Sequence, residues 1–362
     1  MKMKKTRITL SLIILLAFFF VASWLWKIEL LALLLLVWRK EAKAFLTAKW
    51  KYGYKAAWGV LAVMFLLSLP RAFAFPTDRV RCHYIDKEGN LTHTPASHWL
   101  LNAIIPEEEL CNFGMKFAGF AGPFVGLGPS IMNNYYYEKK RGTLDSFTQP
   151  YSELAWNMEQ PVSAVYAQGL NDILGTDDNA FYVIRPKNYD SNTTYPLVVF
   201  CHGFLGNWKL YNGIFKDIKD KIVVCIGTKG LSGIFTDKDI ASVHSKYIPA
   251  LEKMGYKIDM SEVSLLGLSN GGSAIDRAYT RYADRFKNLV YISTGVNNSH
   301  RIHSKVMIIG GGLDHCAPSM RKGYSRLKRN GVAGDRYWDE DESHFILVNK
   351  RSEIIDFLNN TL

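Results

Sequence analysis

The C-terminal half of the sequence alternates short apolar runs with longer helix-like stretches, and this alternation limits the folds open to the chain. Hydrophobic residues occupy successive positions of the runs, which is typical of strands buried on both faces of a sheet. The runs lie at 180–186, 195–201, 221–227, 263–268, 288–294, 305–311 and 335–338. The order predicts an α/β fold, with a mainly parallel, doubly wound sheet covered by helices on both faces.

Ser269 lies at the end of one of these runs, within the sequence Gly267-Leu268-Ser269-Asn270-Gly271. Capping the following helix would need only one Ser or Asn, so the two flanking glycines call for another explanation. In a very tight strand-to-helix turn, small neighbours let the two backbones approach while the serine is held in a strained conformation. Ligands of parallel sheets bind at the carboxyl ends of the strands, so Ser269 is the predicted nucleophile.

A serine hydroxyl needs a base within hydrogen-bond reach and a carboxylate that orients the base. Asp314 follows the run at 305–311, and His344 lies between the last strand and the last helix. The chain order of nucleophile, acid and histidine resembles the α/β-hydrolase family over about residues 178–360. The short intervals between these residues resemble the branch of dienelactone hydrolases, cutinases and polyester hydrolases, which lacks a large cap between serine and acid.

Each of these residues also has a simpler interpretation. Alone, Ser269 would more often be a helix cap, Asp314 a turn residue and His344 a surface histidine. Other candidate acids lie between the last strand and the histidine: Asp335, Asp339 and Asp341. Asp314 is favoured because it follows a strand at the expected place, and the joint order of the features favours the triad.

The resemblance also implies an oxyanion hole and a mechanism. The family's two backbone amides correspond to Phe204, after a His-Gly pair, and Asn270, after the nucleophile. Attack by Ser269 with proton transfer through His344 would give an acyl-enzyme that water hydrolyses, and no metal or organic cofactor is expected. His202 matches the structural histidine of the His-Gly pair and is given no chemical role.

The five cysteines fit an exported domain only loosely. Cys201 and Cys225 lie inside strand-like runs and are expected in the core. Cys82 and Cys111 lie in an irregular region, and they are the pair expected to be oxidised if any pair is. Cys316 follows the predicted acid closely; a thiol near the site is one interpretation, and a small packing residue is the favoured one.

The N-terminal region is the most apolar part of the chain. Residues 8–38 are almost entirely apolar and residues 56–69 form a second block, whereas one helical span needs about 20 apolar residues. Cationic flanks on both sides of the first block favour a hairpin followed by an outward crossing. Residues 1–75 are therefore predicted to form a membrane anchor of two or three transmembrane segments, with the catalytic domain periplasmic or extracellular. A signal peptide cleaved after Ala72-Phe73-Ala74 is the alternative.

The basic character of the protein belongs to this region. Residues 1–55 hold 11 Lys and Arg against 2 Asp and Glu, so they carry most of the net charge of +11. The stretch KWKYGYK (49–55) mixes cations with aromatic residues, as nucleic-acid patches do. Beside an apolar block, contact with anionic lipid headgroups is the favoured interpretation, so membrane lipids rather than nucleic acid are the expected partner.

Residues 76–177 are predicted to form a linker, a lid or an N-terminal extension of a catalytic domain at 178–362. Only about ten residues separate the strands near 294 and 305, so any lid has to come from the earlier region. Trp208 and Tyr211 are predicted to contact a hydrophobic, small-molecule or lipid-like ester. The favoured function is a membrane-anchored carboxylic ester hydrolase. The alternatives are a serine peptidase or acyltransferase, or, less favoured, a non-catalytic binding module.

Overall fold

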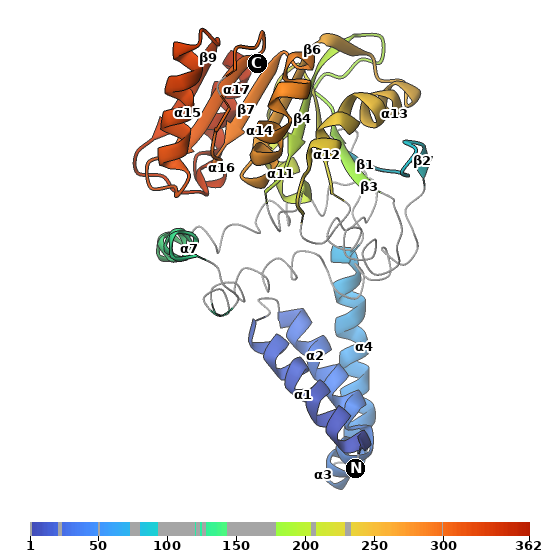
Figure 1. Ribbon diagram of the computed structural model, residues 1–362. Coiled ribbons are helices and arrows are strands. Elements are labelled where there is room, and N and C mark those ends of the chain that lie inside the picture. Colours follow the sequence, from blue (N-terminus) through green and yellow to red (C-terminus); the bar gives the residue numbers. More distant parts are fainter. Residues whose placement is uncertain are drawn as a thin grey trace.

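A computed structural model provides the three-dimensional structure of the protein (Figure 1). The residues that it describes are 2–20, 24–49, 51–72, 80–92, 120, 124, 128–142, 179–203, 208–228, 233–298 and 300–362. Three groups of elements are found there: the N-terminal helices, a helix over residues 129–141, and a large sheet with its covering helices.

The sheet has nine strands in the order β2-β1-β3-β5-β4-β6-β7-β8-β9. Their bounds are Val80–Ile85 (β1), Leu91–Thr92 (β2), Asn179–Ile184 (β3), Tyr195–Cys201 (β4), Ile222–Ile226 (β5), Ile258–Leu268 (β6), Asn288–Ile292 (β7), Lys305–Gly311 (β8) and Gly334–Asp339 (β9). Strands β5, β4, β6, β7, β8 and β9 pair in parallel, whereas β1, β2 and β3 are antiparallel to their neighbours. This mixed, mainly parallel α/β sheet agrees with the predicted α/β-hydrolase fold.

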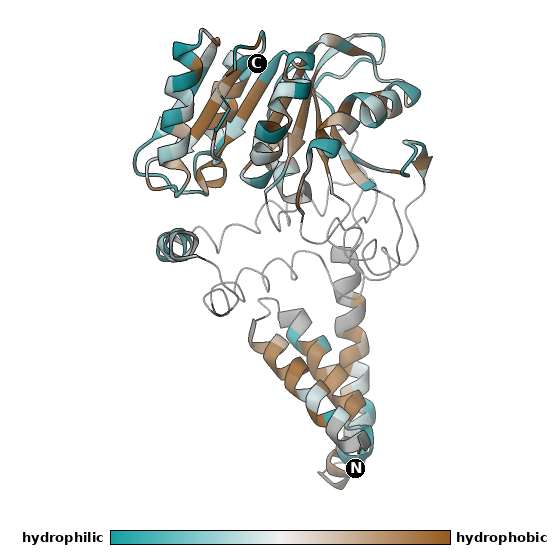
Figure 2. Ribbon diagram, in the orientation of Figure 1, coloured by the Kyte–Doolittle hydropathy of each residue, from teal (hydrophilic) through white to brown (hydrophobic). Residues whose placement is uncertain are grey.

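Two hydrophobic cores lie on opposite faces of the sheet, because successive side chains of a strand point to opposite sides. In β4, Leu197 and Val199 contribute to one core, and Val198 and Phe200 to the other. Figure 2 shows the strands as the most hydrophobic part of this domain, under helices with polar outer faces. Burial on both faces explains why the strands are apolar at successive positions.

Helices cover both faces of the sheet. Their bounds are Trp208–Phe215 (α11), Asp237–Ser242 (α12), Ile248–Lys253 (α13), Asn270–Tyr282 (α14), Ala317–Arg329 (α15), Ile346–Asn349 (α16) and Arg351–Thr361 (α17). Residues of α12, α13, α14 and α15 contribute to the first core, and residues of α11, α16 and α17 to the second. The doubly wound arrangement expected from the sequence is thus confirmed.

The sheet begins before residue 178, where the catalytic domain was predicted to start. Strand β1 pairs along its whole length with β3, and β2 folds back on it after a turn at residues 86–90. Helix α7 (Pro129–Arg141) comes from the same earlier region, and its side chains bond to the loop after β9. Strands β1 and β2 and helix α7 from this region are therefore integral to the sheet domain.

The N-terminal helices are α1 (Lys2–Phe20), α2 (Trp24–Val37), α3 (Arg39–Lys49) and α4 (Gly53–Ala72). Helices α1 and α2 pack through Ile14 and Leu30, and the Trp38 indole N–H donates to Ser11 Oγ at 2.7 Å. Among the helices that the structure describes, none combines the length and the apolar character that a membrane crossing needs. The predicted transmembrane segments therefore gain no support from them.

Candidate active site

Ser269 occupies a sharp turn between β6 and α14. The strand ends at Leu268 and the helix begins at Asn270, so a single residue joins them. Its φ of 50° and ψ of −111° place a non-glycine residue in a sparsely populated backbone region. Such strain costs about 1–3 kcal/mol and persists only where the surroundings enforce it. The Ser269 side chain is partly exposed at the carboxyl end of β6, as the tight turn in the sequence predicts.

The surrounding glycines leave no room for a side chain at this turn. A Cβ atom added to Gly267 would lie 2.5 Å from the backbone nitrogen of Gly272, and one added to Gly271 would lie 2.2 Å from the Cys201 carbonyl oxygen. A Cβ on Gly272 would lie 2.3 Å from the Thr294 methyl group. The glycines therefore permit the close approach of β6, α14 and β4, which is the explanation inferred from the sequence.

We expect the Ser269→Gly variant to be more stable than the wild type by about 1 kcal/mol, because glycine adopts positive φ without the strain of a side chain. The matched control is Ser273→Gly, one turn later in α14, where glycine should lower stability by about 1 kcal/mol. Urea denaturation of both variants measures the difference. Equal destabilisation of both would contradict the strained turn.

Asp314 lies beyond the end of β8, next to the loop after β9. A Cβ on Gly311 would lie 2.0 Å from the Glu342 carbonyl oxygen, so this glycine allows the two segments to touch. The Leu313 N–H donates to that same carbonyl oxygen at 3.0 Å. This contact places Asp314 beside His344, which follows β9 in the chain.

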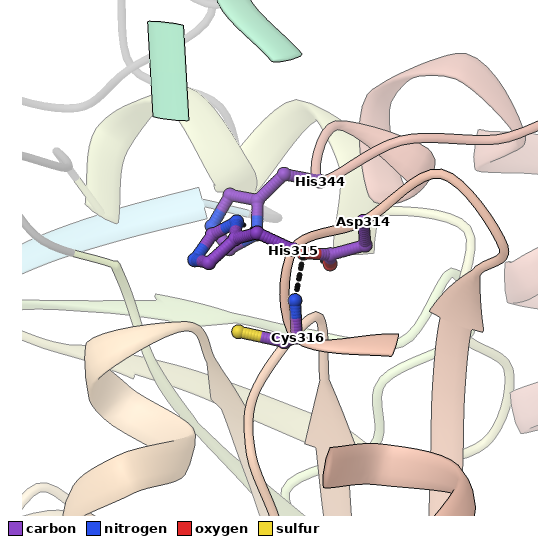
Figure 3. Close-up of side chains that lie close together, drawn as sticks. All are labelled: Asp314, His315, Cys316 and His344. Atoms are coloured by element: carbon purple, nitrogen blue, oxygen red, sulfur yellow. Dashed lines mark hydrogen bonds and ion pairs between the residues drawn. The ribbon is translucent and has the colours of Figure 1, made fainter. Parts of the chain in front are cut away.

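The Asp314 carboxylate contacts two imidazole rings. The Nδ1 atom of His344 is 3.1 Å from both carboxylate oxygens, and the Nδ1 atom of His315 is 3.1 Å from Oδ1. The Cys316 backbone N–H donates to Oδ1 at 2.9 Å. Figure 3 shows the two rings on the same side of the carboxylate, and their centroids are 4.8 Å apart. The acid and histidine named from the sequence are thus brought together, with a second histidine that was given no role.

Protonation of this cluster follows from burial and hydrogen bonding. Burial alone would raise the pKa of Asp314, but the hydrogen bonds from His315 and His344 outweigh it and hold that pKa well below its usual range. The hydrogen bond to Asp314, followed by that with the Cys316 side chain, raises the pKa of His315 to about 10. An ionised carboxylate is what an orienting acid requires.

The raised pKa of His315 predicts a pH dependence of stability. A group whose pKa rises on folding stabilises the protein below its unfolded value of 6.5, and this contribution fades as pH rises toward about 10. After a discount for the exposed part of the ring, we expect a loss of about 1–2 kcal/mol over that range. Urea denaturation between pH 6 and 10 in the presence of a chelator measures it. His315→Gln and Asp314→Asn should both flatten the dependence; a wild-type slope in both variants would contradict it.

The structure describes Asn270 and His202, but it does not describe Phe204, the other residue predicted for the oxyanion hole. Asn270 is the first residue of α14, so its backbone N–H has no acceptor within the helix, and its side chain donates to the Gly233 carbonyl oxygen at 3.2 Å. His202 is fully buried, its Nδ1–H donates to the Gly203 carbonyl oxygen at 2.8 Å, and burial lowers its pKa to about 4. A neutral, buried His202 agrees with the structural role inferred for it.

The predicted substrate contacts and the cysteines are likewise described only in part. Trp208 is the first residue of α11, and its side chain is outside the described part of the structure. Tyr211 is 5% exposed and its ring centroid is 4.9 Å from that of Phe200, a packing position, so its contact with substrate stays a prediction. Cys201 and Cys225 are buried, as predicted. Cys111 and the side chain of Cys82 lie outside the described residues.

Helix α7 contributes contacts to the site that sequence reasoning missed. Its buried Glu138 accepts hydrogen bonds from Ser343 and, at 3.0 Å, from the Asn349 amide. Arg141 donates to both oxygens of Glu342, at 3.0 and 3.1 Å. These bonds hold the two residues that immediately precede His344.

The same helix also reaches the second histidine. The Asn134 amide nitrogen lies 3.4 Å from His315 Nδ1, and the Tyr137 hydroxyl donates to the Asp341 carbonyl oxygen at 3.0 Å. Met132 and Tyr135 are buried and three residues apart, so they lie on one face of the helix. The buried Glu138 lies on the same face, but it is charged, so a hydrophobic pattern could not identify it. A segment about 200 residues earlier in the chain thus forms one wall of the site.

No protein-family model matches the chain, and no curated protein matches it. Solved structures resemble it over about half its length. Pyrococcus horikoshii acylaminoacyl peptidase is 12% identical, with a TM-score of 0.41 over 51% of this chain and 40% of its own. A ferulic acid esterase is 15% identical, with a TM-score of 0.44 over 52% of this chain and 94% of its own. A Pyrobaculum calidifontis esterase is 13% identical, with a TM-score of 0.43 over 51% of this chain and 80% of its own.

Proposed function

We propose that the protein is a serine hydrolase that cleaves a carboxylic ester. The observation that carries the proposal is the strained backbone of Ser269 at the turn between β6 and α14. No local packing need is met by a non-glycine residue there, since glycine would adopt the same conformation without strain. A hydroxyl kept at such a position is a group held for chemistry.

The proposed mechanism assigns one role to each group. Ser269 Oγ attacks the ester carbonyl carbon and gives its proton to His344 Nε2. The Asp314 carboxylate accepts a hydrogen bond from His344 Nδ1, fixes the tautomer and stabilises the imidazolium. The backbone N–H groups of Asn270 and Phe204 stabilise the tetrahedral oxyanion. Collapse expels the alcohol, which takes the proton from His344, and water hydrolyses the acyl-enzyme by the same steps.

The preference for an ester with a hydrophobic acyl group is part of the proposal. It is supported by the exposed apolar side chain of Leu313, just before the acid. A serine peptidase or an acyltransferase would use the same triad, so the reaction class has to be separated by substrate. The non-catalytic alternative would leave the strain at Ser269 without a purpose.

Matched substrates distinguish these functions. The full-length protein in detergent should hydrolyse p-nitrophenyl esters, with an optimum in the acyl chain length, and should be labelled once by a fluorophosphonate. Faster turnover of the matched p-nitroanilides would instead favour a peptidase. Transfer of the acyl group to an added alcohol, with formation of a new ester, would favour an acyltransferase. Failure of both turnover and labelling would leave the binding-module function.

We also propose that the N-terminal helices hold the enzyme at a lipid surface, with the catalytic domain outside the cytoplasm. Support comes from their large exposed hydrophobic side chains, such as Leu12 and Phe19, and from the cationic residues at the start of α1. The full chain should float with anionic vesicles, and less so with zwitterionic ones. The proposal would be contradicted if the vesicles floated and the protein stayed at the bottom of the gradient. An impermeant thiol reagent should label the partly exposed Cys316 in intact cells.

A further inference from the structure

Four potential metal ligands gather beside the proposed triad. Asp314, His315, Cys316 and His344 each offer one donor atom, and these atoms all lie within 4.8 Å of one another. They come from two segments, the turn into α15 and the loop after β9. Figure 3 shows the Cys316 thiol pointing to the same side as the two imidazole rings. The hydrolytic mechanism uses neither His315 nor Cys316.

The distances from Asp314 Oδ1 to the two imidazole nitrogens suit a tetrahedral ion. Bond lengths of about 2.0–2.1 Å to nitrogen and oxygen place neighbouring ligand atoms of a zinc tetrahedron about 3.3 Å apart. The Nδ1 atoms of His315 and His344 each lie 3.1 Å from Asp314 Oδ1. Cys316 Sγ lies within 4.8 Å of a donor atom of each of these three residues and is the fourth donor.

The chemistry of the donors selects the ion. Two imidazoles, a thiolate and a carboxylate form a mixed N, S and O set, which suits Zn²⁺ rather than the hard cations Mg²⁺ and Ca²⁺. The side chains of His315 and His344 are 29% and 21% exposed, so an ion from solution can reach them. The anionic Asp314 is completely buried behind them and supplies a compensating charge.

We propose that these four residues form a Zn²⁺ site. Binding replaces the hydrogen bonds of Asp314 with metal bonds. The Nδ1 proton of a neutral imidazole moves to Nε2, whereas an imidazolium and the thiol each give a proton to solvent. Because it takes the acid and the histidine away from Ser269, an ion at this site inhibits hydrolysis. That inhibitory consequence rests on the proposed function, whereas the binding of the ion does not.

Co²⁺ replaces Zn²⁺ as the probe, because its spectrum reports the ligands without any assay of activity. Titration of the metal-free full-length protein with Co²⁺ should produce tetrahedral d–d bands and a thiolate-to-cobalt charge-transfer band. Both should saturate at one equivalent of Co²⁺. Cys316→Ser should abolish the charge-transfer band, and His315→Gln should weaken binding by at least about 10–100-fold, the loss typical of residues that only support a ligand. Cys225→Ala, which removes a buried thiol elsewhere, should leave the spectrum unchanged.

Two results would overturn the site. One is the absence of the tetrahedral spectrum in the wild type, and the other is a titration of Cys316→Ser and of His315→Gln that is identical to that of the wild type. A second readout tests the consequence. Zn²⁺ should inhibit ester hydrolysis by the wild type reversibly, with a chelator restoring the rate, and should inhibit Cys316→Ser at least about tenfold more weakly. Loss of the proposed esterase function would remove only this second readout, so the failures of the two proposals are distinguishable.

Discussion

Ser269→Ala is expected to lower kcat/KM for a p-nitrophenyl ester by at least about 10⁴-fold, because removal of a nucleophile abolishes the acyl-enzyme route. KM should change little, since the hydroxyl acts only when the tetrahedral intermediate forms. The remaining activity should reflect the oxyanion donors and substrate binding. Steady-state kinetics and mass spectrometry after fluorophosphonate treatment measure the loss of turnover and of the covalent adduct.

The matched control is Ser273→Ala, four residues later in the same helix. Ser273 Oγ bonds the Ser269 carbonyl oxygen and Thr294 Oγ1, both at 3.2 Å, but Ser273 has no role in the mechanism. Its kcat/KM should stay within about tenfold of the wild type, the range of a lost neutral hydrogen bond. A Ser269→Ala variant that keeps both turnover and the adduct would place the nucleophile elsewhere.

Local sequence pattern predicted the central strands well. The bounds expected for β4 and β8 agree with those observed, because six of the seven residues of each strand are buried and the runs are therefore mostly apolar. Strand β6 begins at Ile258 rather than 263. Its first residues, Asp259 and Ser261 among them, are more exposed and polar, so hydrophobic pattern could not extend the strand there.

Asp314 and His344 could be named from the sequence because each follows a strand at the same edge of the sheet, and their catalytic roles stay predictions. Their contact itself was not predictable, since it depends on the approach of β8 to the loop after β9, which Gly311 permits. His315 received no role because the contact of its ring with the Asp314 carboxylate depends on the shape of the turn, which the sequence pattern does not show. The placement of Ser269 relative to His344 in the triad stays a prediction.

Helix α7 shows where sequence reasoning ends. Its bonds to Glu342 and Ser343 join residues separated by about 200 positions, and a single sequence holds no record of such a pairing. The lid inferred for residues 76–177 rested only on the lack of room for a cap elsewhere. That lid stays a prediction. Helix α7, which the structure does describe, bonds to the histidine loop through the buried Glu138 and Glu342, so this loop is sensitive to changes in a remote segment.

The Arg141→Ala variant measures this sensitivity. The Glu342 side chain is only 2% exposed, whereas Arg141 is 37% exposed, so the variant leaves a buried carboxylate without its cation. Loss of one partner of a buried pair costs about 3–5 kcal/mol, and the exposure of Arg141 and the bond from Asn349 reduce the expected loss of stability to about 2–3 kcal/mol. Movement of the loop that carries His344 should lower kcat by about 10–100-fold, with KM nearly unchanged.

A control variant and a rescue variant separate positioning from general damage. Lys139→Ala removes an exposed cation from the same helix turn. It should change neither the free energy of unfolding nor the activation free energy that corresponds to kcat by more than about 0.5 kcal/mol. Arg141→Leu combined with Glu342→Gln removes both charges but keeps an amide at the buried position, so stability and most of kcat should return. If Arg141→Ala lost stability with kcat unchanged in the folded fraction, α7 would be a structural support that does not position His344. The kcat of the folded fraction is therefore the deciding measurement, because the bonds from α7 to Glu342 and Ser343 reach the proposed catalytic histidine through the loop that they hold.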